Sequence, residues 1–360
     1  MMNNRLFLDI HVIQTLPPSN INRDDTGSPK TAQYGGVRRA RVSSQSWKKA
    51  IRDYFKENGD QANVGVRTLE IVKYIANKIQ EIDAEIDFET AQKMADDVLN
   101  KASIKTKDFK AKALFFLGDI QAKQLAQAAI DQVDDKKILQ AILKDNPSID
   151  IALFGRMVAD DPSLNEDASC QVAHAISTHA VETEFDFYTA VDDQAPEDNA
   201  GAGMLGTVEF NSSTLYRYAN IALHEFEQQI QNKEATIKAT QLFIEAFIKA
   251  LPTGKLNTFA NQTLPQAVLV QLRSDRPVNL VTAFEKPIRS SEGYVDQSIQ
   301  ELFEESIKVA KIANKPLSSY VLLLDKCDLE SIVGQEVDSM DGLKALISQE
   351  LEELLPEMSE

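Results

Sequence analysis

The first strongly patterned stretch of the chain is RLFLDIHVIQ, residues 5–14, in which apolar side chains occupy every second position. One face of this segment consists of Leu6, Leu8, Ile10 and Val12, and the other combines Phe7, Asp9, His11 and Ile13. A period of two is typical of a β-strand, because successive side chains of a strand point to opposite faces of its sheet. We therefore predict a strand over residues 5–14 and expect it to lie at the centre of a sheet.

The pattern changes further along the chain. Residues 15–36 are rich in Pro, Asn, Asp and Gly and predict a loop, and residues 37–44 predict a short strand and a turn. Beyond them the spacing is that of a helix, with apolar residues at i, i+3, i+4, i+7 and i+8: Trp47, Ala50, Ile51, Tyr54 and Phe55. Ser43 or Ser44 is placed to cap the first turn of this helix.

The rest of the chain divides into a helical block and a mixed block. Residues 64–146 predict helix after helix with almost no strand signal, as in the stripe of Val66, Leu69, Val72, Ile75 and Ile79. Later, residues 213–223 predict a strand, residues 224–252 a helical region ended by Pro252, and residues 267–274 another strand. This order fits an α+β fold with a ferredoxin-like core that carries a helical insertion.

Composition narrows the class of protein without giving a function. The 360 residues are 43% hydrophobic and 26% charged, which suits about two globular domains, and no apolar run approaches the roughly 18 residues of a membrane span. The N-terminus lacks the basic and apolar regions of a signal peptide. Cys170 and Cys327 lie far apart and without metal-ligand spacing, so we expect free thiols and a cytoplasmic protein.

Charge is strongly segregated along this chain, whose formal net charge is −17. Residues 23–56 hold nine Lys and Arg against three Asp, whereas residues 325–360 hold eleven acids against two Lys. The cations cluster around the start of the predicted helix, where backbone N–H groups already favour a phosphate. Hydroxyl and amide side chains join them there, and together they predict contact with a nucleic-acid backbone: Arg38, Arg39, Arg41, Ser43, Ser44, Gln45, Ser46, Lys48, Lys49 and Arg52. The alternative is a solvated basic helix face.

Signals for catalysis are weak by comparison. Asp24 and Asp25 are a candidate pair for a divalent metal, but such pairs also occur in exposed turns. His174 and His179 are five residues apart, unlike the i, i+4 spacing of a zinc-binding pair on a helix, and His11 stands alone. The sequence contains no P-loop, nucleophile elbow or dinucleotide fingerprint, so we predict neither a cofactor nor a metal.

Several motifs occur in an order that resembles one known family: NRDD, YGGVRRARVSSQSWKKAIR, DIALFGRM, AHAISTH, FYTAVDD and LYRYANI. Over residues 3–290 the chain is similar to the CasC backbone subunits of the type I-E CRISPR surveillance complex, Cascade, in the RAMP superfamily. The resemblance implies a ferredoxin-like, RRM-like palm, a large helical insertion called the fingers and an extended β-hairpin called the thumb. It places the palm at residues 3–58 and 175–290, the fingers at 59–174 and the thumb at 192–213. Residues 291–360 are then an acidic, mixed or helical part that packs on the palm.

The same resemblance implies a non-catalytic role in antiviral defence. Copies of the subunit stack head to tail as a helical filament along the CRISPR RNA (crRNA), displace nucleotides periodically with the thumb, and present the guide for pairing with target DNA. The further partners are the large, small, 5′-handle-binding and crRNA-processing subunits of Cascade. Two alternatives stay open: a metal-dependent RNA endonuclease of the same superfamily that uses Asp24 or Asp25, and an acidic protein that binds only proteins.

Carried over motif by motif, the resemblance assigns RNA contacts to particular residues. In the N-terminal loop and at the helix start these are Arg23, Lys30, Ser43, Gln45, Lys48 and Arg52, and near the tip of the fingers they are Arg156 and Met157. Met204 and Leu205 are the apolar candidates for a thumb wedge, because separated bases expose faces that a side chain must cover. The thumb departs from the family in its acidic lead-in, Asp192, Asp193, Glu197 and Asp198.

Overall fold

The computed structural model describes residues 5–59, 64–190, 194, 204–325 and 333–356 of the chain. Contacts within the protein divide it into two compact units. Unit 1 comprises Met1–Ile51, Val172–Asn220 and Ile244–Leu346, and unit 2 comprises Arg52–Gln171, Ile221–Phe243 and Ile347–Glu360. Within the described ranges, no helix is both long and apolar enough to cross a membrane.

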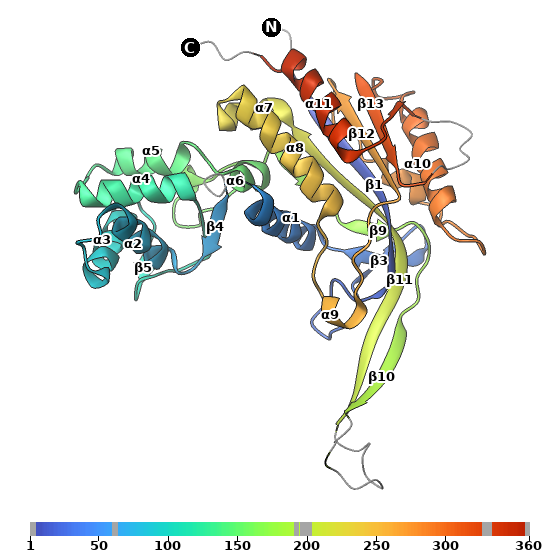
Figure 1. Cartoon of the computed structure of the whole chain (residues 1–360), viewed down its shortest axis with the longest axis horizontal. Coiled ribbons are helices and arrows are strands. Elements are labelled where there is room, and N and C mark those ends of the chain that lie inside the picture. Colours follow the sequence, from blue (N-terminus) through green and yellow to red (C-terminus); the bar gives the residue numbers. More distant parts are fainter. Residues whose placement is uncertain (1–4, 60–63, 191–193, 195–203, 326–332, 357–360) are drawn as a thin grey trace. The chain divides into compact units, whose positions relative to one another are not determined.

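A ten-stranded sheet dominates the structure (Figure 1). Its strands are β1 (Phe7–Ser19), β2 (Thr31–Tyr34), β3 (Val37–Val42), β8 (Cys170–Val172), β9 (Ala175–Ser177), β10 (Glu184–Ala190), β11 (Met204–Ala222), β12 (Ala267–Arg273), β13 (Ser318–Leu323) and β14 (Gln335–Glu336). The helices that lie wholly or partly in unit 1 are α1 (Ser44–Asn58), α8 (Lys233–Lys249), α9 (Leu256–Phe259), η4 (Leu280–Phe284), α10 (Val295–Val309) and α11 (Met340–Leu354).

Four of these strands lie side by side in the order β12-β1-β11-β9. By their place along the chain they are the fourth, first, third and second strands of this set, which is the strand order of a ferredoxin-like sheet. β1 lies between β12 and β11, and it pairs antiparallel with β12 from Phe7↔Arg273 to Ile13↔Ala267. The predicted α+β fold with a ferredoxin-like core, and the central position of the first strand, are therefore confirmed.

Both faces of β1 are buried, although its sequence alternates between an apolar face and a mixed one. Ile10 on the apolar face is 0% exposed, and so are Asp9 and His11 on the mixed face. The mixed face contributes to an apolar cluster with η4 and α10: Ile13, Tyr216, Tyr218, Leu269, Leu280, Phe284, Ile299, Leu302 and Phe303. Asp9 and His11 are thus removed from water and need polar partners inside the protein.

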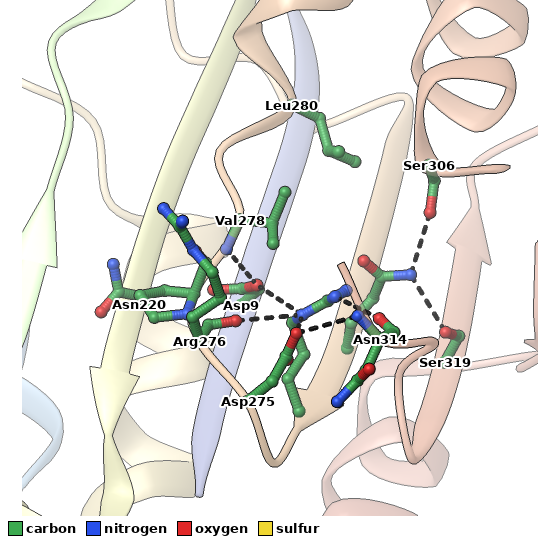
Figure 2. Close-up of polar contacts among 12 residues, drawn as sticks. Asp9, Asn220, Asp275, Arg276, Val278, Leu280, Ser306, Asn314 and Ser319 are labelled. Atoms are coloured by element: carbon green, nitrogen blue, oxygen red, sulfur yellow. Dashed lines mark hydrogen bonds and ion pairs between the residues drawn. The ribbon is translucent and has the colours of Figure 1, made fainter. Parts of the chain in front are cut away.

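Both residues have such partners. Asp9 accepts hydrogen bonds from the Tyr218 hydroxyl at 2.8 Å and from the Val278 N–H at 3.0 Å. Figure 2 shows the Val278 bond and the contact in which Arg273 Nε lies 4.0 Å from the Asp9 carboxylate. Burial outweighs these contacts and raises the pKa of Asp9 to about 7. His11 shares a hydrogen bond of 2.9 Å with the Tyr216 hydroxyl.

Side-chain hydrogen bonds also join the C-terminal part of unit 1 to the sheet. Gln271 of β12 donates to the Ser306 hydroxyl of α10 at 3.1 Å and to the Ser319 hydroxyl of β13 at 3.0 Å (Figure 2). β13 also pairs with β12 in the sheet. Residues beyond 290 therefore complete both an edge and a face of this sheet.

A long hairpin extends from the sheet, formed by β10 and β11 (Figure 1). Its register runs from Glu184↔Phe210 to Ala190↔Met204. The Tyr188 ring lies over Gly206, where a Cβ atom would be 2.4 Å from the ring, so a larger residue would displace this ring. Of the predicted thumb, residues 192–193 and 195–203 lie outside the described residues, and so do the side chains of Met204 and Leu205.

Unit 2 is mainly helical. Its helices are α2 (Ile71–Ile82), α3 (Phe88–Lys101), α4 (Asp119–Ile130), α5 (Lys136–Lys144), α6 (Ile149–Phe154), η2 (Pro162–Leu164) and α7 (Leu223–Ile230). Val72, Ile75 and Ile79 of α2 are buried in one cluster with α3, α4 and α5, as their spacing predicts. Short strands also occur in this unit: β4 (Gly65–Thr68), β5 (Thr106–Lys107), β6 (Lys110–Ala111) and β7 (Phe115–Gly118).

Some local predictions are wrong. Val66 and Leu69 are not part of a helix, because Val66 pairs with Leu117 between β4 and β7 and α2 begins only at Ile71. The predicted loop over residues 15–36 contains the end of β1 and all of β2. β2 forms because it pairs with β3 across Gly35 and Gly36, whose positive φ angles of 58° and 77° suit glycine.

Candidate nucleic-acid interface

The start of α1 is capped by side chains from its own first turn and from the preceding loop. The Ser46 N–H lies 3.3 Å from Ser43 Oγ, so Ser43 rather than Ser44 provides the cap. The Ser43 N–H donates in turn to Asn22 Oδ1 at 2.8 Å, which fixes the N-terminal loop against the helix. Trp47, Ile51 and Phe55 are buried as their helical spacing predicts, so the apolar stripe of α1 holds this end in place.

His174 also lies at the start of α1. Its Nδ1 atom accepts a hydrogen bond of 3.0 Å from the Ser44 N–H, so the proton of the neutral ring lies on Nε2. Partial burial, together with the charges of Arg41 and Lys30, lowers the pKa of His174 below its ordinary value. The residue spacing predicted no such role, because it indicated only that His174 and His179 are unlike a zinc-binding pair on a helix. Its partner is Ser44, 130 residues away in sequence.

Lys30 and Arg41 are held next to each other by the main chain. The Arg41 N–H donates to the Lys30 carbonyl oxygen at 2.9 Å, and the Lys30 N–H donates to the Asn22 carbonyl oxygen at 2.9 Å. Both side chains are partly exposed. The side chains of Lys30, Arg41 and His174 therefore lie together with the start of α1 in unit 1. An anion bound there is stabilised by all of these groups.

The other predicted contact residues of unit 1 differ in exposure. Arg23, Arg38, Gln45 and Lys49 are exposed, and Lys48 is half-buried. Arg39 is 0% exposed and donates to main-chain carbonyl oxygens, among them Ser177 at 2.9 Å and Phe284 at 2.8 Å. Burial lowers the pKa of Arg39, whose guanidinium serves the interior of the sheet and presents no face to a phosphate.

The predicted contact residues of unit 2 are also mostly engaged within the protein. Arg52 donates to Asp150 at 3.0 Å and stacks on the Phe116 ring, with 4.4 Å from its Cζ atom to the ring centroid. Arg156 is 4% exposed, donates to the Leu143 carbonyl oxygen at 2.6 Å, and has its pKa lowered to about 10 by burial. Met157 is 83% exposed. Of these three side chains, Met157 alone is presented fully to a ligand.

Asp24 organises the N-terminal loop. One of its carboxylate oxygens accepts from the Thr26 N–H at 2.9 Å, the Thr26 hydroxyl at 2.7 Å and the Ser28 N–H at 3.0 Å. These hydrogen bonds lower the pKa of Asp24, the Thr26 hydroxyl most of all. In the part of the chain that the structure describes, no group of three or more His, Cys, Asp and Glu side chains is arranged to hold a metal ion.

Two further features bear on nucleic acid. The central strands carry Tyr216 and Tyr218, but these rings lie in the apolar cluster with η4 and α10 and cannot stack on bases as sheet aromatics do in RRM domains. Exposed aromatic side chains occur instead on the hairpin, where Phe185 and Phe187 of β10 are 60% and 71% exposed. The alternation in the segment EFDFY is the signal that the sequence analysis overlooked.

Comparison with known proteins gives a consistent result along nearly the whole chain. The profile of a family described as CT1975-like protein matches residues 8–349. A solved chain described as "CRISPR RNA-guided surveillance complex, pre-nicking" is 32% identical, with a TM-score of 0.84 over 97% of this chain and 100% of that one. A second, described as "CRISPR RNA-guided surveillance complex", is 29% identical, with a TM-score of 0.65 over 96% and 99%. No curated protein matches.

Proposed function

The chain belongs to the CT1975-like family of Cas proteins, and we propose that it is the crRNA-binding backbone subunit of a type I-E CRISPR Cascade complex. Several copies stack head to tail along the guide RNA in the cytoplasm, together with the other Cascade subunits. Each copy holds the RNA by its phosphates, so that the bases stay available for pairing with target DNA.

One observation carries this proposal: the start of α1 presents phosphate-binding groups of several kinds at one place. The start of α1 supplies the positive end of the helix dipole, Lys30 and Arg41 supply charge, and His174 supplies a neutral imidazole. Groups of this kind position a nucleic acid without reading its sequence. A subunit that accepts guides of many sequences needs this kind of contact, and the net charge of −17 of the whole chain disfavours binding outside it.

In this proposal the hairpin of β10 and β11 displaces nucleotides. The exposed rings of Phe185 and Phe187 offer faces for stacking, which is worth roughly 1–3 kcal/mol per base in proteins that bind single strands. Met204 and Leu205 begin β11 and stay the proposed apolar wedge. Copies of this hairpin, one for each subunit, would interrupt the guide at regular intervals.

The proposal also assigns the chain no catalytic step. Asp24 is committed to three hydrogen bonds within its loop, which supports a structural role for that carboxylate. A single-turnover assay of the assembled complex with Mg²⁺ and complementary RNA tests this assignment. Cleavage that disappears in Asp25→Ala would replace the scaffold by an RNA endonuclease.

The experiment that tests the proposal is co-purification. The tagged chain is expressed with its partner subunits and a CRISPR array, purified at moderate salt, and its bound RNA is sequenced. We expect discrete RNAs of spacer length with repeat-derived ends, held by several copies of this chain. Protein without RNA, or with random RNA fragments, would contradict the proposal.

A further inference from the structure

A small cavity lies directly beside Lys30 and Arg41. It has a volume of about 20 Å³ and is lined by the end of β1, the N-terminal loop, β3 and β11. Asn20 and Asn211 lie in its wall together with the two cations. A cavity of this size accommodates one group as large as a water molecule.

Asn20 lines this cavity and carries an acceptor without a partner among the described residues. Its side chain is 1% exposed, and its Nδ2 atom donates to the carbonyl oxygens of Gly27 at 2.9 Å and Glu209 at 2.8 Å. These two bonds use both protons of the amide and so fix the orientation of the side chain. Its Oδ1 atom is buried and accepts no hydrogen bond from any residue that the structure describes.

Asn211 contributes the complementary donor. It is 7% exposed, and its Nδ2 atom is buried without a hydrogen-bond partner in the described part of the chain. Asn20 directly follows β1 and Asn211 belongs to β11, almost 200 residues later in sequence, and both line one cavity. A buried donor and a buried acceptor that both lack partners each cost free energy, and a ligand that pairs with both recovers it.

A hydroxyl group satisfies both requirements, because it accepts one hydrogen bond and donates another. The cavity adjoins the cations to which the proposed function assigns RNA phosphates, and in RNA every phosphate has a ribose hydroxyl close by. The 2′-hydroxyl is also the group by which a protein distinguishes RNA from DNA. On the basis of the proposed function, we propose that Asn20 and Asn211 bind a 2′-hydroxyl of the guide and so select ribose over deoxyribose.

This contact lets the interface distinguish RNA from DNA, which its other groups cannot do. Lys30, Arg41, His174 and the start of α1 all favour phosphate, which RNA and DNA share. Asn211 Nδ2 donates to the 2′-oxygen, and the 2′-hydroxyl donates to Asn20 Oδ1. A deoxyribose in the same place makes neither bond.

The test compares RNA with DNA on the full-length chain. Fluorescence anisotropy measures the affinity for a labelled single-stranded RNA and for the all-deoxy strand of the same sequence, in one buffer. The variant is Asn211→Ala, which removes the donor without breaking a hydrogen bond of its Nδ2 atom to another described residue. The control is Asn261→Ala, because Asn261 is 1% exposed, also has unpartnered amide atoms among the described residues, and does not line the cavity.

We expect Asn211→Ala to weaken RNA binding about tenfold, leave DNA binding unchanged and bring the two affinities closer together. Asn261→Ala should leave their ratio as in the wild type. If Asn211→Ala weakens RNA and DNA equally, or changes neither, the cavity holds a structural water and the sugar contact is wrong. If the wild-type chain binds RNA no better than DNA, the sugar contact also fails while the phosphate interface stands.

A second arm uses the RNA rather than the protein. Single 2′-deoxy substitutions are placed one at a time along an RNA that the assembled complex holds. We expect weakened binding at positions that repeat once per subunit, and no further loss at these positions in Asn211→Ala. A uniform response along the strand would overturn the proposal. Failure of the complex to hold any RNA would instead contradict the proposed function itself.

Discussion

Arg39 and Arg41 are two residues apart on β3 and lie on the same face of the strand, yet they belong to regions with opposite roles. Arg39 lies in the sheet interior, where it donates to the carbonyl oxygens of Ser177 and Phe284. Arg41 lies beside Lys30 at the start of α1 and stays partly exposed. The residue type and the alternation of the strand are the same for both. What separates them is whether another part of the chain covers the side chain.

The sheet interior tolerates charge because it provides partners for most of each charged group. Arg217, 1% exposed, stacks on the Trp47 ring, with 3.9 Å from Cζ to the ring centroid, and donates to Gln14 and to the Phe247 carbonyl oxygen. Burial lowers its pKa to about 9. The start of α1 does the reverse and keeps its cations where a ligand can reach them. Three variants, taken from the largest expected effect to the smallest, test this difference.

Asp9→Asn is expected to change the pH dependence of stability most. The folded protein holds the pKa of Asp9 at about 7 against an ordinary 3.8, so the folded state binds this proton more tightly than the unfolded state. The contribution of Asp9 to the free energy of unfolding is therefore greatest below about pH 4 and is lost as pH rises towards 7. The loss amounts to up to about 4 kcal/mol. Urea unfolding between pH 4.5 and 7.5 measures it.

Asp25→Asn is the matched control for this experiment, because Asp25 is exposed in the N-terminal loop. The free energy of unfolding of the wild type relative to Asp9→Asn should fall with rising pH, whereas Asp25→Asn should follow the wild type. Parallel profiles for all three proteins would show that Asp9 is charged in the folded state throughout. The interior would then hold a carboxylate as readily as a guanidinium.

Arg39→Met is expected to lower the free energy of unfolding by about 3 kcal/mol, because it leaves several buried carbonyl oxygens without donors. Arg38→Met, at the neighbouring exposed position, should change it by less than about 0.5 kcal/mol. Chemical denaturation at one pH compares the two. An Arg39 variant as stable as the wild type, but weaker in RNA binding, would move Arg39 from the interior group to the interface group.

The double variant Lys30→Ala/Arg41→Ala is expected to leave stability nearly unchanged and to act on RNA binding. Loss of two phosphate contacts on a single strand lowers the slope of log affinity against log salt by about 1.4. Anisotropy titrations between low and moderate salt measure this slope. Lys56→Ala, an exposed lysine near the other end of α1, should leave it unaltered. Loss of affinity for one RNA sequence only would contradict backbone binding.

The sequence was sufficient for features that depend on local periodicity. The stripe from Trp47 to Phe55 predicted α1, and the alternation over residues 5–14 predicted β1, because each pattern describes how one element meets its surroundings. The same pattern did not reveal that both faces of β1 are buried. That depends on η4 and α10, which come more than 260 residues later.

The residues of the interface were also predicted only in part, because their exposure depends on segments that are distant in the sequence. Cations near a helix start gave Arg41, and the family resemblance gave Lys30. The same cluster equally suggested Arg39 and Arg52, whose partners are Ser177, Phe284 and Asp150. His174 could not be found from spacing, since its partner is Ser44. Exposure and pairing between distant segments are properties of the folded chain.

The order in which the sheet is assembled also has a consequence for how the protein is made. β1 is among the first segments to be synthesised, whereas its partner β12 begins about 250 residues later, at Ala267. A ribosome that adds roughly 5–20 residues per second leaves β1 without this partner for roughly 13–50 s. The strand that forms the centre of the finished sheet is therefore an exposed apolar segment during synthesis. Until β12 has emerged, this segment is open to aggregation with other chains.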